Sequence, residues 1–186
     1  MKINRLLILI SASFTLVSCK QQRTESNNEN LESTIGIIKQ EKMNIKKDYI
    51  ELNLITSEFM RCIKEKDKDA FLNLFYDNNT PWLGKFEPKS EQITVDNNPN
   101  AINPKGIYDI SKVEFIDSMV SAPDTVVIEE KFSNLLIDTD GWIASVNFDY
   151  EMFMDDKMTN SGKEFWHLVK TNKGWKISSV VYSVFY

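Results

Sequence analysis

The chain has 186 residues, a length typical of one domain with short attachments. Hydrophobic residues make up 42% of the chain, enough for a core, and the formal net charge of −5 offers no basic surface for a nucleic acid partner. With one histidine and two cysteines, the sequence lacks the spacing of a His/Cys metal site, and its six scattered glycines form no phosphate-binding loop. We therefore expect no metal, no cofactor and no nucleic acid.

The N-terminus has the pattern of an export signal. Lys2 and Arg5 precede an apolar stretch, residues 6–17, which is shorter than the ~20 residues of a membrane-spanning helix. The stretch ends in the letters LVSC, which resemble the lipobox of bacterial lipoproteins, where the chain is cut before the cysteine and the cysteine is acylated. The resemblance implies a signal peptide over residues 1–18 and a palmitate-type lipid anchor on Cys19. The alternative is an ordinary signal peptide in which the cysteine falls by chance.

A lipidated Cys19 would hold the protein on a membrane without crossing it, because two or more acyl chains anchor stably where one does not. Lys20 follows the cysteine and no acidic run is present, which by resemblance to lipoprotein sorting favours the outer membrane of the bacterial cell envelope. Lipidation leaves Cys62 alone, so no intramolecular disulfide can form.

The next segment is polar and predicts a flexible tether over residues 19–43. Its first fifteen residues after the cysteine contain only Leu31 as an apolar residue, too little to bury a core. Ile35, Ile37 and Ile38 are an alternative start for the structured region. We expect the folded domain to cover residues 44–186.

Three helices are expected in the first half of this domain. Apolar residues at three- and four-residue spacing predict a long helix that ends near Asp67. That apolar stripe consists of Ile50, Leu54, Ile55, Phe59, Cys62 and Ile63. Asp67 is expected to cap a short second helix, and Ser111 and Glu114 form a capping box for a third. Residues 77–106, rich in Pro and Asn, are expected to be mostly loop, with a strand at Trp82–Phe86.

The rest of the chain reads as strands separated by turns. Strands are predicted over residues 125–139, with a bulge, and over 142–154, 163–170 and 175–186. The second of them alternates and predicts one face made of Trp142, Ala144, Val146, Phe148, Tyr150, Met152 and Met154. Asp155 and Asp156 belong to a turn, since two adjacent carboxylates fall short of a cation cage. Helices followed by a meander of strands predict an α+β fold with the N-terminal helices packed on an antiparallel sheet.

Two stretches carry a resemblance to a known superfamily. They are KEKDKDAFLNLF, residues 64–75, and GKEFWHLVKTNKGWKISSVVYS, residues 162–183. Together with the third helix they resemble the nuclear transport factor 2-like superfamily, which includes SnoaL-like cyclases, ketosteroid isomerases and scytalone dehydratases. The resemblance covers residues 48–186 and implies a cone-shaped fold, in which a curved antiparallel sheet wraps the helices around an apolar pocket. It also implies a homodimer and a small apolar ligand.

The residues at the family's catalytic positions argue against catalysis. The isomerase-like members use a Tyr on the first helix and an Asp after the second, and the resemblance places Phe59 and Leu83 there. Neither side chain can move a proton. The dehydratase-like members use a His, for which only His167 is available. Tyr150, Tyr182, Trp82 and His167 are candidates for contact with a ligand. The alternative for the two tyrosines is ordinary sheet packing, and for His167 it is a wall or interface histidine with a satisfied hydrogen bond.

Three hypotheses follow. The first is a membrane-anchored envelope lipoprotein with a non-catalytic ligand-binding or protein-interaction domain. The second is an enzyme of the dehydratase, isomerase or cyclase kind that uses His167 as a general base in an apolar pocket. The third is a dimerisation domain with a filled core. The sequence favours the first, because the acid–base pair is missing.

Overall fold

The computed structural model of the chain describes residues 16–103, 105–108 and 110–186, with side chains from residue 31 onward. Residues 1–15 of the predicted signal peptide lie outside the described residues, as does the side chain of Cys19. The chain divides into two compact units, Met1–Met43 and Asn44–Tyr186. Within the described part, no helix is long and apolar enough to cross a membrane.

The first unit is helical wherever the structure describes it. Helix α1 runs over Leu16–Glu65, so it begins in the first unit and ends in the second. Every side chain from residue 31 to 43 is exposed. The segment expected as a flexible tether therefore has a helical backbone, because a helix satisfies its own hydrogen bonds and this stretch is rich in Glu, Lys, Gln and other helix formers. Its role as a tether stays a prediction.

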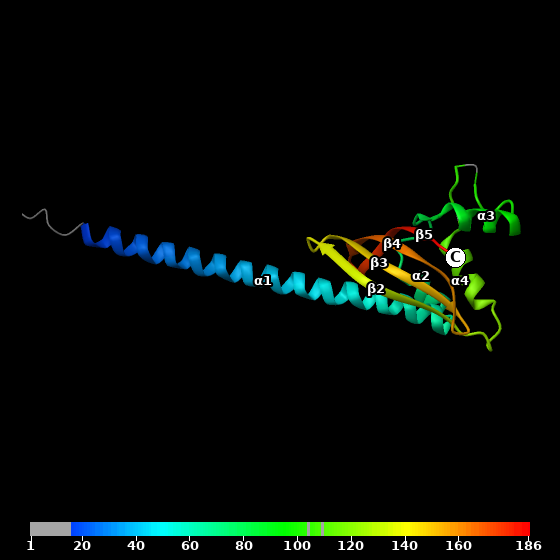
Figure 1. The fold of residues 1–186 in the computed structure, drawn as a ribbon. Helices are drawn as coiled ribbons and strands as arrows, with labels where there is room; N and C mark the ends of the chain where they lie inside the picture. Colours follow the sequence, from blue (N-terminus) through cyan, green and yellow to red (C-terminus); the bar gives the residue numbers. More distant parts are fainter. Residues whose placement is uncertain (1–15, 104, 109) are drawn as a thin grey trace, which may run out of the picture. The chain divides into compact units, whose positions relative to one another are not determined.

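In the second unit, α1 buries a narrower face than the sequence predicted. Leu52, Phe59 and Ile63 are fully buried together with the thiol of Cys62. Ile50 and Leu54, which were expected in the apolar stripe, are 54% and 62% exposed. Ile50 and Leu54 are exposed because the sheet covers only one side of this helix, and both residues lie just beyond that side (Figure 1).

The two short helices with capping signals form as expected. Helix α2 spans Lys68–Asn73, and the Asp67 side chain accepts a hydrogen bond from the backbone N–H of Ala70. Helix α4 spans Lys112–Val120, and its capping box is complete: Ser111 Oγ accepts from the Glu114 N–H, while Glu114 accepts from the Ser111 N–H at 2.9 Å. These caps satisfy the free N–H groups of the first turn.

Helix α3 was not expected. It covers Pro88–Asn97, inside the stretch that the sequence predicted as loop. The carboxylate of Glu87 accepts hydrogen bonds from the N–H groups of Lys89 and Ser90, and Pro88 occupies the first turn, where its missing N–H costs nothing. The proline was thus a helix start rather than a breaker.

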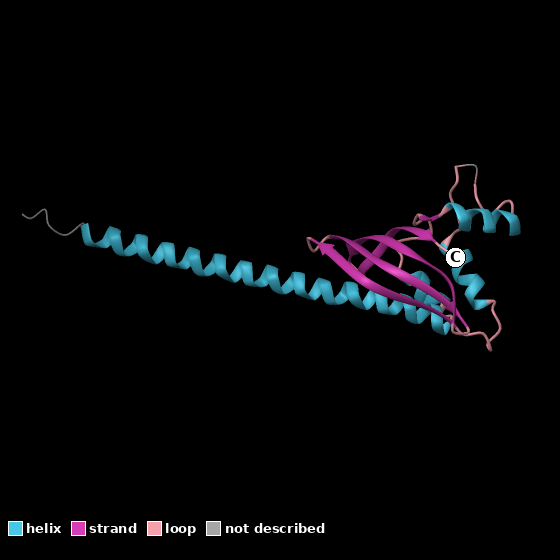
Figure 2. Cartoon of the chain, in the orientation of Figure 1, coloured by secondary structure: helices cyan, strands magenta, loops and turns pink. Residues whose placement is uncertain are grey.

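The sheet has five strands in the order β1-β5-β4-β3-β2. Figure 2 draws the strands in magenta, beside the helices in cyan. The strands are β1 Trp82–Phe86, β2 Ile128–Thr139, β3 Ile143–Met154, β4 Lys157–Thr171 and β5 Gly174–Val184. Strands β2 to β5 pair antiparallel, whereas β1 runs parallel to β5. The predicted sheet was wholly antiparallel. A tight hairpin forces two strands to run antiparallel, but β1 and β5 are joined through the rest of the chain, so they can pair parallel.

The alternation predicted for β3 is confirmed over its central residues. Ala144, Val146, Phe148, Tyr150 and Met152 are all buried. The two end positions of the predicted face are instead exposed: Trp142 lies in the turn before β3 and is 74% exposed, and Met154 is the last residue of the strand and is 45% exposed.

The turn before β4 and the bulge in β2 are the two irregular places in the sheet that bear on the sequence predictions. Strand β4 begins at Lys157 rather than at residue 163, since Asp155 and Asp156 both take positive φ and turn the chain at once. Strand β2 carries the predicted bulge: its register with β3 shifts between Ser133 and Leu136, and Asn134 has φ of 53°.

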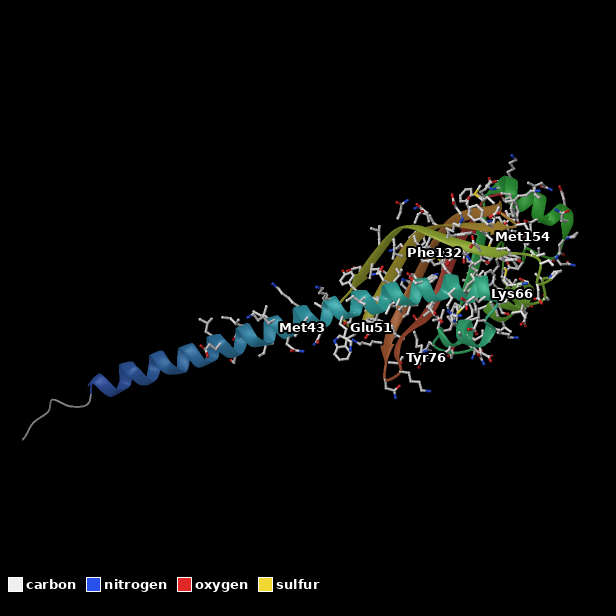
Figure 3. All side chains as sticks on the ribbon, turned by 90° about the horizontal axis from the view of Figure 1, so that it is seen from below. Met43, Glu51, Lys66, Tyr76, Phe132 and Met154 are labelled. Carbon is white, nitrogen blue, oxygen red and sulfur yellow. The ribbon has the colours of Figure 1, made fainter. Side chains whose placement is uncertain are left out.

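The core between helices and sheet is aromatic. Phe59 of α1 lies 4.8 Å from Trp166, 4.9 Å from Phe71 and 5.8 Å from Phe132 between ring centroids. Figure 3 labels Phe132, which brings β2 into contact with α1. These aromatic rings fill the space between the sheet and helices α1 and α2.

Candidate functional site

A cavity of about 260 Å³ lies against the inner face of the sheet, beside α4. All five strands contribute to its wall. The lining residues are Trp82, Phe86, Tyr108, Ile110, Phe115, Ser118, Met119, Ile128, Glu130, Tyr150, Met152, Phe153, Met154, Thr159, Asn160, Glu164, Tyr182, Val184 and Tyr186. The wall is therefore mainly apolar and aromatic, with a few polar groups, as in most small-molecule sites.

Two glycines allow two tyrosines to lie in this wall. A Cβ at Gly162 would stand 1.9 Å from the carbonyl oxygen of Ser183 and 2.8 Å from the ring of Tyr150. A Cβ at Gly84 would stand 2.7 Å from the ring of Tyr182. Because neither glycine has a Cβ, each tyrosine ring can pack closely against the neighbouring strand. The Tyr150 hydroxyl also donates a hydrogen bond to the Ser183 carbonyl oxygen at 2.9 Å. Burial raises the pKa of both phenols, so both remain neutral.

Two carboxyl groups are buried in the same wall. Glu130 of β2 is 5% exposed and Glu164 of β4 is 3% exposed. Burial, and then the negative charge of Glu164, raises the pKa of Glu130 well above its ordinary value. Burial also raises the pKa of Glu164 to about 7, while the hydrogen bond from Trp166 opposes this rise. Near neutral pH the pair therefore keeps at least one proton.

The hydrogen bonding of this carboxyl pair is incomplete. Glu164 Oε2 accepts from the indole N–H of Trp166 at 2.6 Å. Glu130 Oε2 is buried and has no partner among the described residues, and the buried indole N–H of Trp82 makes no hydrogen bond of good geometry either. That N–H lies near enough to the Tyr182 hydroxyl to oppose the rise in its pKa. Buried polar atoms are normally paired, so Glu130 Oε2 as an acceptor and the Trp82 N–H as a donor are available to hydrogen-bond a ligand.

The structure brings together three of the four residues that the sequence proposed for a ligand. Tyr150, Tyr182 and Trp82 all line the cavity. His167 does not join them: it is exposed on the face opposite Trp166, and its Nδ1 lies 3.0 Å from Ser179 Oγ. The geometry therefore gives no support to His167 as the base of an apolar pocket.

The two positions that argued against family-type catalysis are also not in the wall. Phe59 is fully buried in the aromatic core, and Leu83 is 37% exposed on β1. Within the described part of the chain, no group of His, Cys, Asp and Glu side chains could hold a metal ion.

Sequence reasoning missed the carboxyl pair as a site. The signal was present, because Glu164 shares strand parity with Trp166 and Leu168, and Glu130 shares it with Phe132. A glutamate on an otherwise apolar strand face marks a buried carboxyl. The register places Glu130 beside Met152 and Glu164 beside Phe148 of β3, and only the lining of the cavity shows that both carboxyls enter it.

No family model and no curated protein sequence matches the chain. Solved structures do match. One is a nuclear transport factor 2-like superfamily protein from Salmonella enterica, at 17% identity and a TM-score of 0.52, covering 75% of this chain and 92% of that one. The chain has a nuclear transport factor 2-like fold.

Two further structures with this fold agree. One is a protein of unknown function from Silicibacter pomeroyi, at 13% identity and a TM-score of 0.51, covering 76% of this chain and 98% of that one. The other, from Shewanella baltica and also of unknown function, has 14% identity and a TM-score of 0.50 and covers 75% and 95%. At such identities the likeness establishes the nuclear transport factor 2-like fold alone, and function has to come from the site.

Proposed function

We propose that the protein is a lipid-anchored protein of the bacterial envelope whose nuclear transport factor 2-like domain binds a small, largely apolar ligand in the cavity beside α4. The observation that carries the proposal is the cavity itself, in which the Glu130 carboxyl and the Trp82 N–H are buried without good partners. Leaving such groups unpaired costs stability, so their retention favours a guest that pairs them.

The size of the cavity restricts the guest. A volume of 260 Å³ lies just below the ~300–1,000 Å³ of sites for drug-sized ligands. A single ring with a short polar substituent is therefore a suitable occupant, and a steroid-sized molecule is not. The empty space also opposes the hypothesis of a filled core that serves dimerisation alone.

Binding is tested on the chain from residue 20 to 186, which keeps the whole unit Asn44–Tyr186. Small ring compounds, with benzyl alcohol as the first probe, are titrated while tryptophan fluorescence is followed. Met119→Trp fills the cavity and is expected to abolish binding, whereas Val120→Trp adds the same side chain at the next, 41% exposed position and is expected to leave it intact. Equal binding by both variants would refute the site.

The lipid anchor rests on the sequence alone and has its own test. In cells given labelled palmitate, the full chain is expected to take up label and to enter the membrane fraction. Cys19→Ser is expected to lose both properties, and Cys62→Ser, which changes a buried core thiol, is expected to keep them. Lys20→Asp is then expected to move the protein from the outer to the inner membrane. Label that survives Cys19→Ser would end the lipoprotein proposal.

A homodimer is supported by one row of side chains on the outer face of the sheet. Leu83, Val181, Phe165, Asn147 and Leu136 stand in register across all five strands. The four apolar members of this row are between 37% and 68% exposed. Sedimentation is expected to give a dimer that Phe165→Glu dissociates and that Lys89→Glu, an exposed change on α3, leaves intact.

A second candidate function is an acid–base enzyme of the dehydratase, isomerase or cyclase kind. The observation that favours it is the Glu130–Glu164 pair, whose raised pKa values suit proton transfer near neutral pH. In a screen of small substrates, Glu164→Gln would abolish any such activity. If His167→Ala lost the activity and Glu164→Gln kept it, His167 on the outer face of the sheet would be the general base.

A further inference from the structure

The charges in the cavity wall all have one sign. Its titratable groups are two carboxyls, Glu130 from β2 and Glu164 from β4, and four phenols at positions 108, 150, 182 and 186. No lysine, arginine or histidine is among the described residues that line it. A wall of this kind disfavours an anionic guest, because no cation stands ready to pair with it.

Two lysines on elements that border the cavity bond to other groups. Lys112, at the start of α4, is buried, but its Nζ donates to the Asn78 carbonyl at 2.8 Å and lies over the ring of Phe75. Lys85 of β1 pairs with Glu91 of α3 and with the Gly106 carbonyl. Neither lines the cavity, so among the described lining residues an ionised carboxyl pair has no counter-ion.

Aromatic faces surround the same space. Trp82 lies 5.2 Å from Phe115 and 5.8 Å from Tyr182 between ring centroids, the latter edge to face, and Phe86 lies 5.2 Å from the ring of Tyr108. Aromatic rings attract a cation placed over their faces, most strongly where water is excluded, and clusters of them recognise amine and quaternary ammonium groups.

We propose, on the basis of the ligand-binding function inferred above, that the ligand is a small organic monocation: an amine whose ammonium group meets the Glu130 and Glu164 carboxyls while its apolar part packs on the aromatic wall. The ammonium N–H groups supply the donors that Glu130 Oε2 lacks. The cation takes the place of the proton that the pair otherwise retains, and that proton leaves to solvent, so charge is conserved in the cavity.

This exchange has a measurable signature. The carboxyls retain their protons at low pH, and an amine must then displace a proton in order to bind. Affinity for an amine that stays protonated throughout should therefore rise between about pH 5.5 and about pH 8, and affinity for a neutral probe should not. The phenols of Tyr108, Tyr150 and Tyr182 do not alter this sign, because their raised pKa values keep them neutral over the range.

The experiment compares benzylamine with benzyl alcohol, two probes of nearly equal shape, by calorimetry on residues 20–186. At about pH 8, benzylamine is expected to bind about ten-fold more tightly. At about pH 6.5, its heat of binding is expected to differ between two buffers of different ionisation enthalpy, because a proton is released. Glu164→Gln and Glu130→Gln are expected to abolish the preference for the amine and its pH dependence while keeping the affinity for the alcohol. Glu151→Gln, an exposed change on β3, is the matched control.

The possible outcomes distinguish the proposal of a cationic ligand from the proposal of a ligand-binding cavity. Equal or tighter binding of benzyl alcohol at about pH 8 would overturn the cationic ligand and leave the binding cavity standing. Amine binding that survives both glutamine substitutions would overturn the role of the carboxyls. If neither probe binds, nor any other small ring compound, both proposals fail together.

Discussion

Raising the pH is expected to destabilise the folded domain, because a carboxyl buried in the cavity holds a proton that the unfolded chain releases. In the unfolded chain Glu164 ionises near its ordinary pKa of 4.5, whereas in the fold its pKa is raised to about 7. Between these values the folded state binds more protons than the unfolded state, so the free energy of unfolding falls as pH rises. The contribution is fully present below the ordinary pKa and is lost as pH passes the folded value.

The magnitude follows from that interval. Each pKa unit corresponds to about 1.4 kcal/mol, so the rise of the Glu164 pKa from 4.5 to about 7 removes about 3 kcal/mol of stability. Glu130, whose pKa is also raised well above the ordinary value, adds to the same loss. A loss of this size is a large part of the ~5–15 kcal/mol that keeps a typical domain folded.

Urea unfolding at about pH 5 and about pH 8, followed by tryptophan fluorescence, measures this difference. The double variant Glu130→Gln/Glu164→Gln keeps a side-chain acceptor for Trp166 but cannot ionise. It is expected to lose about 3 kcal/mol less than the wild type over that range, and Glu151→Gln is expected to follow the wild type. Parallel pH profiles for the double variant and the wild type would refute the reasoning.

Three further predictions concern stability and are checked by the same urea titrations. Gly162→Ala is expected to cost about 1–3 kcal/mol, since the new Cβ would meet the Ser183 carbonyl, whereas Gly36→Ala, with no atom within 4 Å, should cost nothing; similar midpoints would contradict the close approach. Phe59→Ala is expected to cost about 3–5 kcal/mol and Leu54→Ala, which is 62% exposed on the same helix, less than about 0.5 kcal/mol; equal losses would mean that the helix face is misassigned. Ser111→Ala is expected to cost about 1 kcal/mol through loss of the α4 cap and Ser118→Ala less, and the reverse order would count against the capping box.

Much of the fold could be predicted from local sequence. The capping box at Ser111 and the cap at Asp67 gave the starts of α4 and α2, because each depends only on residues within one turn. The period of two along β3 gave its buried face. The start of α3 was missed because Pro88 signals both a loop and a first helical turn, and only the hydrogen bonds of Glu87 decide between them.

The candidate site was predictable only in part. Tyr150 and Tyr182 were chosen because a ring with a polar tip suits a pocket wall, and Trp82 was a further candidate. All three line the cavity. The parity of His167 within β4 was known, but both faces of that strand are apolar in sequence, so its exposure had to come from the packing. That Glu130 of β2 and Glu164 of β4 line one cavity depends on how two non-adjacent strands pack, and no local sequence pattern contains it.

The bulge in β2 has a consequence for self-association through strand edges. β2 is one open edge of the sheet, and the irregularity at Asn134 divides its ladder with β3 into Ile128–Ser133 and Leu136–Thr139. At the opposite edge β1 has five residues, and Gly84 and Tyr108 exchange backbone hydrogen bonds across its free side. An unprotected edge recruits further strands and leads to aggregation, whereas short or interrupted edges resist it. Neither edge of this sheet presents a long, even run of free backbone groups, so a high local concentration of the protein need not lead to fibres.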